Sequence, residues 1–292
     1  MMKSANSKKD QAIVFILLGQ SNAVGHDLPM QEEDKIKIPL ANVWGLSREH
    51  NQAYDHTELV WEGYVSAGMN LAEEQDDTYS VANCLARRWQ NAIDGGADLP
   101  DLYVVHIAIG AQGVTERYMW YPDRAPVLVP GKLGTVNISL HPFTEHILSL
   151  AREYMEKIGK DARYVLHWRG GEEEGDVPVA DMPDLFDIYV RLFGDYYAAL
   201  GETLPVILHR VESYQQSRDL LGDEGVARLD YINGVFDQLA EAYDNISVFD
   251  PKRYPAYTPD ASQYFGIFRP DHVHFLREVN EWVAGEIMAE LQ

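Results

Sequence analysis

The stretch AIVFILLGQSNAVG, residues 12–25, decides the fold predicted for this sequence. Its first seven residues are apolar and rich in β-branched and aromatic types. The run is too short to cross a bilayer, so it predicts a buried strand of a parallel sheet. After Gly19 comes a small polar cluster at the carboxyl end of that strand, where open α/β sheets place ligand sites: Gln20, Ser21 and Asn22. Ser21 is therefore a candidate nucleophile, although serine also suits the N-cap of a following helix.

A nucleophilic serine needs a base, and the far end of the chain offers one in RPDHVHF, residues 269–275. Asp271 stands three residues before His274, so its carboxylate can fold back onto the imidazole and fix its tautomer. His272 is the competing base, but its spacing points it away from Asp271 on an extended segment. These residues predict a Ser21, His274, Asp271 triad. The alternative is that Asp271 caps the last helix and both histidines lie on the surface.

With these two ends in view, the sequence resembles the SGNH hydrolases. Gly19–Asn22 resembles the first block of that family and Asp271-x-x-His274 the last. The G-Q-S-N form is similar to the sialate O-acetylesterase and acetylxylan esterase branch. Between them, Ile107–Gly110 resembles the segment whose glycine offers an N–H to the oxyanion, and Trp168–Glu172 resembles a W-x-Q-G-E block. The blocks occur in the family's order and span nearly the whole chain.

The resemblance implies an oxyanion hole made by the backbone N–H groups of Ser21 and Gly110. It also implies that Glu172 braces the site by hydrogen bonding. The residues expected to contact the substrate or support the site are Gln20, Asn22, Gln112, Arg169, Gly171 and Glu172. One departure matters, because Gly170 stands where that branch has a glutamine. Losing one oxyanion donor typically costs about 10²–10³ in turnover. Gln112, Asn22 or the Gly170-Gly171 backbone are the candidate replacements; a weak or specialised member of the family is the alternative.

Five apolar runs alternate with helical patterns, which favours a three-layer α/β/α fold with a central, mainly parallel five-stranded sheet, SGNH or flavodoxin-like. The predicted strands are 12–18, 102–108, 163–168, 205–211 and 246–249, and the predicted helices are 78–93, 143–158, 184–200, 226–243 and 275–291. Two long regions remain: residues 27–77, which should pack over the site or contain short strands, and residues 112–140.

Two clusters of residues, one in the long region 112–140 and one after the predicted strand 163–168, have two interpretations each. The first cluster follows Gly110 and consists of Arg117, Tyr118, Trp120, Tyr121 and Arg124. These side chains either contact a sugar or attach the loop to the protein surface. The second cluster is the acidic run Glu172, Glu173, Glu174 and Asp176. Its carboxylates could bind a hard cation, but the run lacks the ligand spacing of a calcium loop. We therefore favour a solvated acidic loop.

Composition narrows the function further. A chain of 292 residues, 46% of them apolar, fits one α/β domain over 1–292, with the first ten residues disordered. The net charge of −22 argues against nucleic acid and anionic membranes as partners and favours a neutral substrate. Cys84 reads as a small core residue. The charged start lacks a signal-peptide cleavage site, which favours a cytoplasmic location unless a native leader is absent from this sequence.

The predicted reaction is hydrolysis of an O-acetyl ester on a carbohydrate through an acyl-enzyme, without a metal or organic cofactor. The carbohydrate itself is implied only by the resemblance, and the oligomeric state stays open. Three alternatives remain. The first is an O-acetyl sialic acid esterase, which needs a cation from Arg117, Arg124 or Arg169. The second is a metal-dependent hydrolase using His272, His274 and the acids 172–176. The third is a carbohydrate-binding protein that has lost catalysis.

Overall fold

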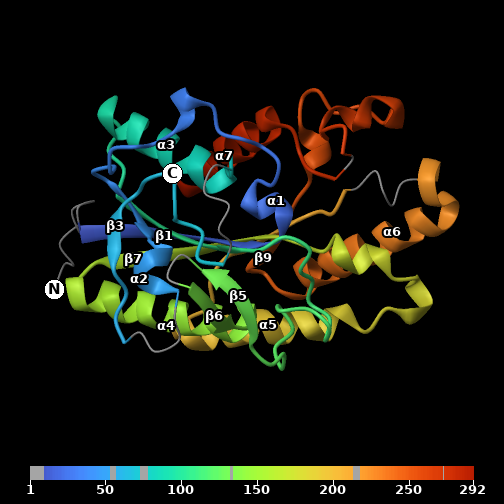
Figure 1. Ribbon diagram of the computed structural model, residues 1–292, viewed down its shortest axis with the longest axis horizontal. Coiled ribbons are helices and arrows are strands. Elements are labelled where there is room, and N and C mark those ends of the chain that lie inside the picture. Colours follow the sequence, from blue (N-terminus) through green and yellow to red (C-terminus); the bar gives the residue numbers. More distant parts are fainter. Residues whose placement is uncertain (1–9, 53–56, 73–77, 132–133, 213–217, 272) are drawn as a thin grey trace.

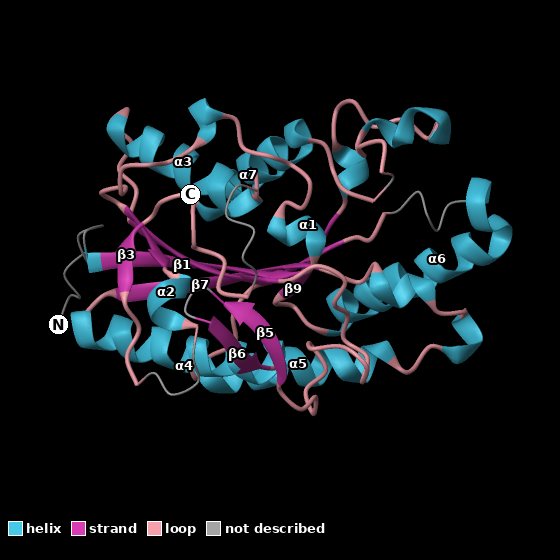
Figure 2. Cartoon of the chain, viewed as in Figure 1, coloured by secondary structure: helices cyan, strands magenta, loops and turns pink. Residues whose placement is uncertain are grey.

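A seven-stranded sheet forms the centre of the computed structural model, which describes residues 10–52, 57–72, 78–131, 134–212, 218–271 and 273–292. Its strand order is β3-β2-β4-β1-β7-β8-β9. The strands are β1 (Gln11–Gly19), β2 (Val43–Leu46), β3 (Trp61–Gly63), β4 (Asp101–Ala108), β7 (Asp161–Arg169), β8 (Val206–His209) and β9 (Ile246–Phe249). Figure 2 shows these strands lying between two layers of helices. The predicted three-layer α/β/α fold is confirmed.

The strand β1 occupies the middle of the sheet, as its composition predicts. Eight of its nine residues are buried, and it pairs in parallel with β4 on one side and β7 on the other. The five predicted strands occur in the order β4-β1-β7-β8-β9, the flavodoxin-like arrangement of sequential strands 2-1-3-4-5. In that arrangement the ligand site lies at the carboxyl ends of the strands, where β1 and β7 meet. Gly19 is paired with both Ala108 and Arg169, so these three strands end together.

The prediction of five strands is wrong by two, because β2 and β3 extend the sheet beyond β4. The strand β2 is parallel to β4, and β3 is antiparallel to β2. Both come from the region 27–77, where the prediction allowed for short strands. They are four and three residues long and carry Gly45 and Gly63, so they show no usable periodicity. A separate antiparallel hairpin, β5 (Val127–Gly131) and β6 (Gly134–Ile138), occupies the second long region, where no strand was predicted.

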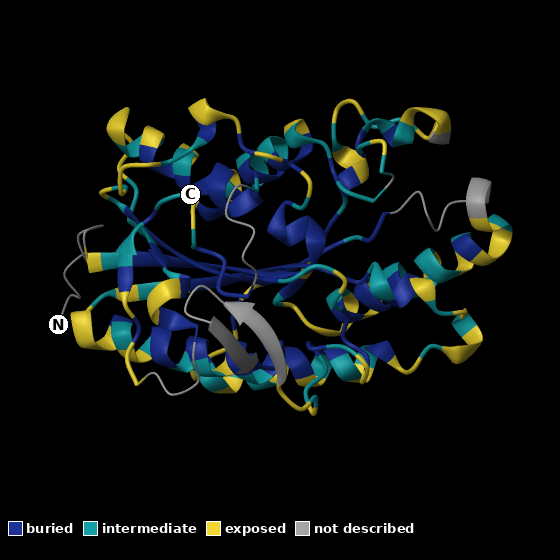
Figure 3. Ribbon diagram, viewed as in Figure 1, coloured by how far each residue is buried: buried dark blue, intermediate teal, exposed yellow. Residues whose placement is uncertain are grey.

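Helices cover both faces of the sheet (Figure 1). One face packs against α1 (Ser21–Val24), α3 (Val81–Asp94) and α7 (Arg277–Leu291). The other packs against α4 (Leu140–Ile158), α5 (Leu185–Leu200) and α6 (Arg218–Ala242). The shorter helices are α2 (Arg48–Asn51), η2 (Glu32–Asp34), η3 (Glu173–Asp176), η4 (Val179–Asp181), η5 (Pro251–Arg253) and η6 (Ala261–Gly266). Figure 3 shows the sheet as the most deeply buried layer.

The predicted helices are all present, and their ends follow local sequence signals. Ser80 caps α3, Asp184 caps α5, and Gly159 ends α4 in the left-handed conformation. The start of α6 was misplaced: it begins at Arg218, and Gly222 interrupts it with φ of 62°. Among the described residues, no helix combines the length and apolarity that crossing a bilayer requires.

Cys84 lies in the core, as predicted, with no exposed surface. Burial raises the pKa of its thiol to about 12, which keeps it protonated and unreactive at neutral pH. The predicted disorder of the first ten residues falls on 1–9, outside the described residues, and on Asp10, which the structure places directly before β1.

Candidate active site

Ser21 lies at the turn from β1 into α1, at the carboxyl edge of the sheet. Its exposed fraction is 7%. The turn depends on Gly19, whose φ is 143° and whose missing Cβ would lie 2.0 Å from the carbonyl oxygen of Arg169. The N-cap of α1 is Gln20, whose backbone N–H donates to that same carbonyl at 3.0 Å. The interpretation of Ser21 as the helix cap is therefore wrong, since it is the first residue within the helix.

Glu172 holds both neighbours of Ser21. Its Oε2 accepts a hydrogen bond from Gln20 Nε2, and its Oε1 accepts one from Asn22 Nδ2, each at 2.7 Å. One carboxylate thus contacts both residues that flank Ser21 in the turn from β1 into α1.

Asn22 joins the nucleophile turn to the C-terminal segment. Its Nδ2 donates to the carbonyl oxygen of Val273, and its Oδ1 accepts from the backbone N–H of Phe275, both at 3.2 Å. Val273 and Phe275 are the residues on either side of His274. The segments that carry Ser21 and His274 therefore lie against each other, as the predicted triad requires.

Asp271 turns back onto the imidazole of His274. Its Oδ2 lies 3.2 Å from His274 Nδ1, while its Oδ1 accepts from the backbone N–H groups of Val273 and His274 at 3.1 and 3.0 Å. Partial burial would raise the pKa of Asp271, but these N–H groups and the imidazole hold it below its usual value. The N-cap of α7 is Leu276, so the reading of Asp271 as a helix cap is wrong. His274 is also not a surface residue, with a side chain only 16% exposed.

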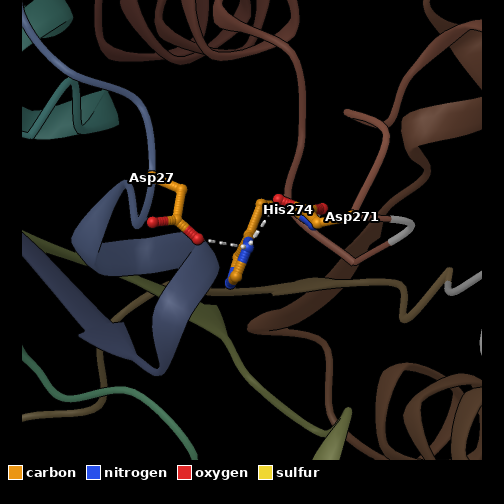
Figure 4. A group of neighbouring side chains, drawn as sticks. All are labelled: Asp27, Asp271 and His274. Carbon is orange, nitrogen blue, oxygen red and sulfur yellow. Dashed lines mark hydrogen bonds and ion pairs between the residues drawn. The ribbon is translucent and has the colours of Figure 1, made fainter.

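Two further residues reach His274 from the loop after α1, and sequence reasoning missed both. Asp27 Oδ2 lies 3.5 Å from His274 Nδ1, on the opposite side from Asp271 (Figure 4). The ring of His26 stacks on that of His274 with centroids 5.7 Å apart, and His26 Nε2 would lie 2.9 Å from a Cβ on Gly110. The signal available in the sequence was that His26 and Asp27 follow the GQSN motif, residues 19–22, within a few residues.

The acidic run after β7 is not a solvated loop. Glu172 is engaged as above, and Glu173 accepts a hydrogen bond from the hydroxyl of Tyr118 at 3.1 Å. Glu174 is 2% exposed, and its Oε1 accepts from the backbone N–H of Val114 at 2.7 Å. Burial raises the pKa of Glu174 to about 7.

The metal-ligand set predicted for the alternative hydrolase is not assembled in the part of the chain that the structure describes. The described residues close enough to share an ion are Asp27, Asp271 and His274, and none of the acids 172–176 joins them. His272, the other predicted ligand and the competing base, lies outside the described residues.

The loop after Gly110 divides into buried and outer residues. Trp120 has no exposed surface, and its Nε1 donates to the carbonyl oxygen of Gly19 at 3.2 Å. It therefore supports the turn that carries Ser21 and offers no face to a sugar.

The other residues of this loop contact one another. Gln112 Oε1 accepts a hydrogen bond from the backbone N–H of Met119 at 3.0 Å, within the same loop. Arg117 lies over the ring of Tyr118 at 4.6 Å. Arg124 donates to the carbonyl oxygen of Glu116 at 3.3 Å, and Tyr121 is half-buried.

Arg169 is a buried supporting residue. It is 2% exposed, and its Nη1 donates to Asn280 Oδ1 at 3.0 Å. Burial lowers the pKa of its guanidinium to about 10. The suggestion that Arg169 offers its charge to a substrate carboxylate is therefore wrong.

The glycines after Arg169 leave little space for a side chain. A Cβ on Gly170 would lie 3.2 Å from the Trp168 ring, whose Nε1 donates to the carbonyl oxygen of Gly170 at 3.1 Å. Gly171 has φ of 129°, and a Cβ there would lie 2.7 Å from Val211. The backbone at the position of the missing glutamine is thus fixed by the neighbouring indole.

Comparison with solved structures identifies the fold. NanS matches over 97% of both chains at 14% identity with a TM-score of 0.58. A protein from Arabidopsis thaliana matches over 96% of this chain and 97% of its own, at 16% identity and a TM-score of 0.58. The chain shares its fold with NanS and with the Arabidopsis protein. An acetylxylan esterase from Geobacillus stearothermophilus overlaps at 12% identity over 95% of this chain and 93% of its own, with a TM-score of 0.44. No family model and no curated protein sequence matches the chain.

Proposed function

We propose that this protein is a serine esterase that removes O-acetyl groups from a carbohydrate. The observation that carries the proposal is the pair of hydrogen bonds between Asn22 and the residues flanking His274. Asn22 donates to the carbonyl oxygen of Val273 and accepts from the N–H of Phe275, so the turn that carries Ser21 lies against the histidine segment. Asp271 orients the imidazole through Nδ1, which leaves Nε2 to act as the base. The strand order adds support, because Ser21 directly follows β1 and Gln20 at the switch point of the sheet, where such folds bind ligands.

In the proposed mechanism, His274 Nε2 takes the proton of Ser21 as its hydroxyl attacks the ester carbonyl. The backbone N–H groups of Ser21 and Gly110 stabilise the oxyanion, and the carboxylate of Asp271 stabilises the imidazolium. The imidazolium returns its proton to the departing sugar hydroxyl, leaving acetyl on Ser21. Water, deprotonated by the same imidazole, then releases acetate and restores the serine.

The substrate we propose is a neutral acetylated sugar, such as an acetylated xylo-oligosaccharide. The net charge of −22 repels anions, and the buried guanidinium of Arg169 does not face solvent. Arg117 and Arg124 lie on the outer loop and are each engaged by a neighbouring group. A sialate carboxylate would thus meet little compensating positive charge at this edge.

The test measures acetate release from 4-nitrophenyl acetate and from acetylated xylo-oligosaccharides. We expect turnover in the native protein, loss of at least 10³-fold in Ser21→Ala, and unchanged turnover in Ser247→Ala, an exposed serine on β9. A serine-directed phosphonate should label Ser21 in peptide mapping. A native protein without turnover that still binds sugar would favour the binding-protein alternative, and loss of turnover with a chelator would favour the metal alternative.

A further inference from the structure

His274 Nδ1 faces two carboxylates, which come from opposite ends of the chain. Asp271 Oδ2 lies 3.2 Å away and Asp27 Oδ2 lies 3.5 Å away. In Figure 4 the two side chains approach the imidazole from different sides, Asp27 from the loop after α1 and Asp271 from the segment before α7. A triad needs only one of them to orient the ring, so the second requires an explanation.

Arg269 supplies that explanation, because it offsets the charge of Asp271. Its Nη1 lies 3.3 Å from Asp271 Oδ2 and 3.9 Å from Asp27 Oδ2. Arg269 and Asp271 together are neutral, so an imidazolium beside them alone would gain little net attraction. With Asp27 included, the three groups carry one net negative charge, which the imidazolium then balances.

We propose that Asp27 is a positioning residue that lies beside Nδ1 of His274 and supplies the net negative charge that Arg269 removes from Asp271. The proposal rests on the proposed esterase function. No proton passes to Asp27: Nε2 receives the serine proton, and the Nδ1 proton stays on the ring, hydrogen-bonded to Asp271, while Asp27 acts through its charge. His26, stacked on the imidazole, is the remaining titratable group that faces it among the described residues.

The backbone supports a dedicated role for Asp27. Its φ is 55°, a left-handed conformation that costs energy for residues other than glycine and that aspartate and asparagine tolerate best. The preceding turn is fixed by hydrogen bonds from the N–H groups of Gly25 and His26 to the carbonyl oxygen of Ser21, both at 3.0 Å. The turn that follows the nucleophile therefore also delivers the carboxylate to the base.

The exposure of Asp27 sets the expected size of its effect. Its side chain is 60% exposed and that of Asp271 is 32% exposed, so solvent and salt screen the Asp27 charge more. We therefore expect a modest contribution that diminishes at high ionic strength. Removing Asp27 makes the imidazolium less stable, so the acidic limb of the kcat/KM profile should move to lower pH. Removing Arg269 should move that limb to higher pH.

The experiment compares native protein with Asp27→Asn, Arg269→Gln and the double variant, at 20 mM and 1 M NaCl. Asparagine keeps the size and the left-handed preference of aspartate, so Asp27→Asn should fold normally. We expect kcat/KM on 4-nitrophenyl acetate to be roughly three- to tenfold lower in Asp27→Asn than in the native protein at low salt. At high salt this difference should narrow, because salt screens the Asp27 charge of the native protein. Asp27→Glu should restore part of the loss, and the double variant should titrate between the two single variants.

The matched control is Asp244→Asn, which removes the same charge from an exposed residue. Asp244 precedes β9 at the amino ends of the strands, whereas the candidate site lies at their carboxyl ends. Its kcat/KM and pH profile should equal those of the native protein. Equal shifts in Asp244→Asn and Asp27→Asn would attribute the effect to overall charge and would overturn the proposal.

A second readout separates this inference from the proposed function. Nuclear magnetic resonance follows the pH midpoint at which the His274 ring signals titrate, and this needs no substrate. A midpoint that moves to lower pH in Asp27→Asn supports the inference even if no ester is turned over, in which case the proposed function alone fails. An unchanged midpoint overturns the inference even in an active esterase.

Discussion

Asn22 Oδ1 accepts a hydrogen bond from the backbone N–H of Phe275 at 3.2 Å, across 253 positions of sequence. The same side chain donates to Glu172 and to the carbonyl oxygen of Val273. A single amide therefore joins its own turn to two other segments of the candidate active site, the one that carries Glu172 and the one that carries His274. Its neighbours use both its donor and acceptor groups, which is why neither aspartate nor alanine can replace it without loss.

The first prediction concerns Asn22→Asp. The new carboxylate would face Glu172 at hydrogen-bond distance and would lose the donor to Val273, so both charge repulsion and an unpaired acceptor result. We expect kcat/KM on 4-nitrophenyl acetate to fall tenfold or more and the free energy of unfolding to fall by about 1–3 kcal/mol. Urea denaturation gives the second quantity. Asn91→Asp, on the exposed side of α3, is the control and should change neither.

The second prediction concerns Glu172→Gln. Gln20 and Asn22 both donate a hydrogen bond to this carboxylate. A glutamine side chain has one acceptor oxygen and one donor NH₂ group, so one of the two amides would face a donor and lose its hydrogen bond. We expect kcat to fall by roughly tenfold with little change in KM, because the nucleophile turn loses its fixed position. Steady-state kinetics measures both. Glu241→Gln, exposed near the end of α6, should behave as the native protein, and a native kcat in Glu172→Gln would contradict the bracing role.

The third prediction concerns Glu174 and pH. Burial raises the pKa of its carboxyl to about 7 in the folded protein, above the ordinary value of about 4.3 in an unfolded chain. The folded state therefore holds a proton that the unfolded state releases, and stability from this group is lost as pH rises from about 4.3 through 7. Glu174→Gln should be more stable than the native protein at pH 8, by up to about 3 kcal/mol, with the difference vanishing towards pH 4.

Urea denaturation of both proteins between pH 4.5 and 8 checks this expectation. The amide oxygen of the glutamine can still accept from the backbone N–H of Val114, so the variant keeps that contact. Parallel curves of stability against pH would show that Glu174 does not titrate in this range.

The fourth prediction concerns substrate charge. Because the protein carries a net charge of −22, an anionic ester should be repelled at long range and a neutral one should not. Raising NaCl from 20 to 500 mM should increase kcat/KM for O-acetyl sialic acid relative to that for acetylated xylo-oligosaccharides, since any salt effect on the catalytic residues acts on both substrates. A sialate preference at low salt that Arg117→Ala abolishes would assign the site to the anionic sugar instead.

Sequence reasoning succeeded where one local pattern determines the structure. The apolar run before Gly19 predicted the central strand, and Ile246–Phe249 coincides with β9 as observed. Helix ends followed residues such as Asp184 and Gly159, whose side chain or backbone freedom terminates a helix.

It failed where long-range packing decides. The strands β2 and β3 exist because β4 offers an edge to pair with, which no window of their own sequence reveals. The sequence left two interpretations of Trp120 open, contact with a sugar or support of its loop, and only the structure shows that its indole donates to the carbonyl oxygen of Gly19. The approach of Asp27 to His274 depends on a left-handed turn and on the C-terminal segment, so only coordinates bring the two together.

The bonds of Asn22 to Val273 and Phe275 also have a consequence for synthesis of the chain. During translation the nucleophile turn leaves the ribosome some 250 residues before its partners do. Until then Asn22 lacks two of its three partners, and the nascent polypeptide carries only part of the proposed active site. Completion of that site is therefore a late event of biogenesis, which requires the segment between η6 and α7 to dock against the turn that carries Ser21.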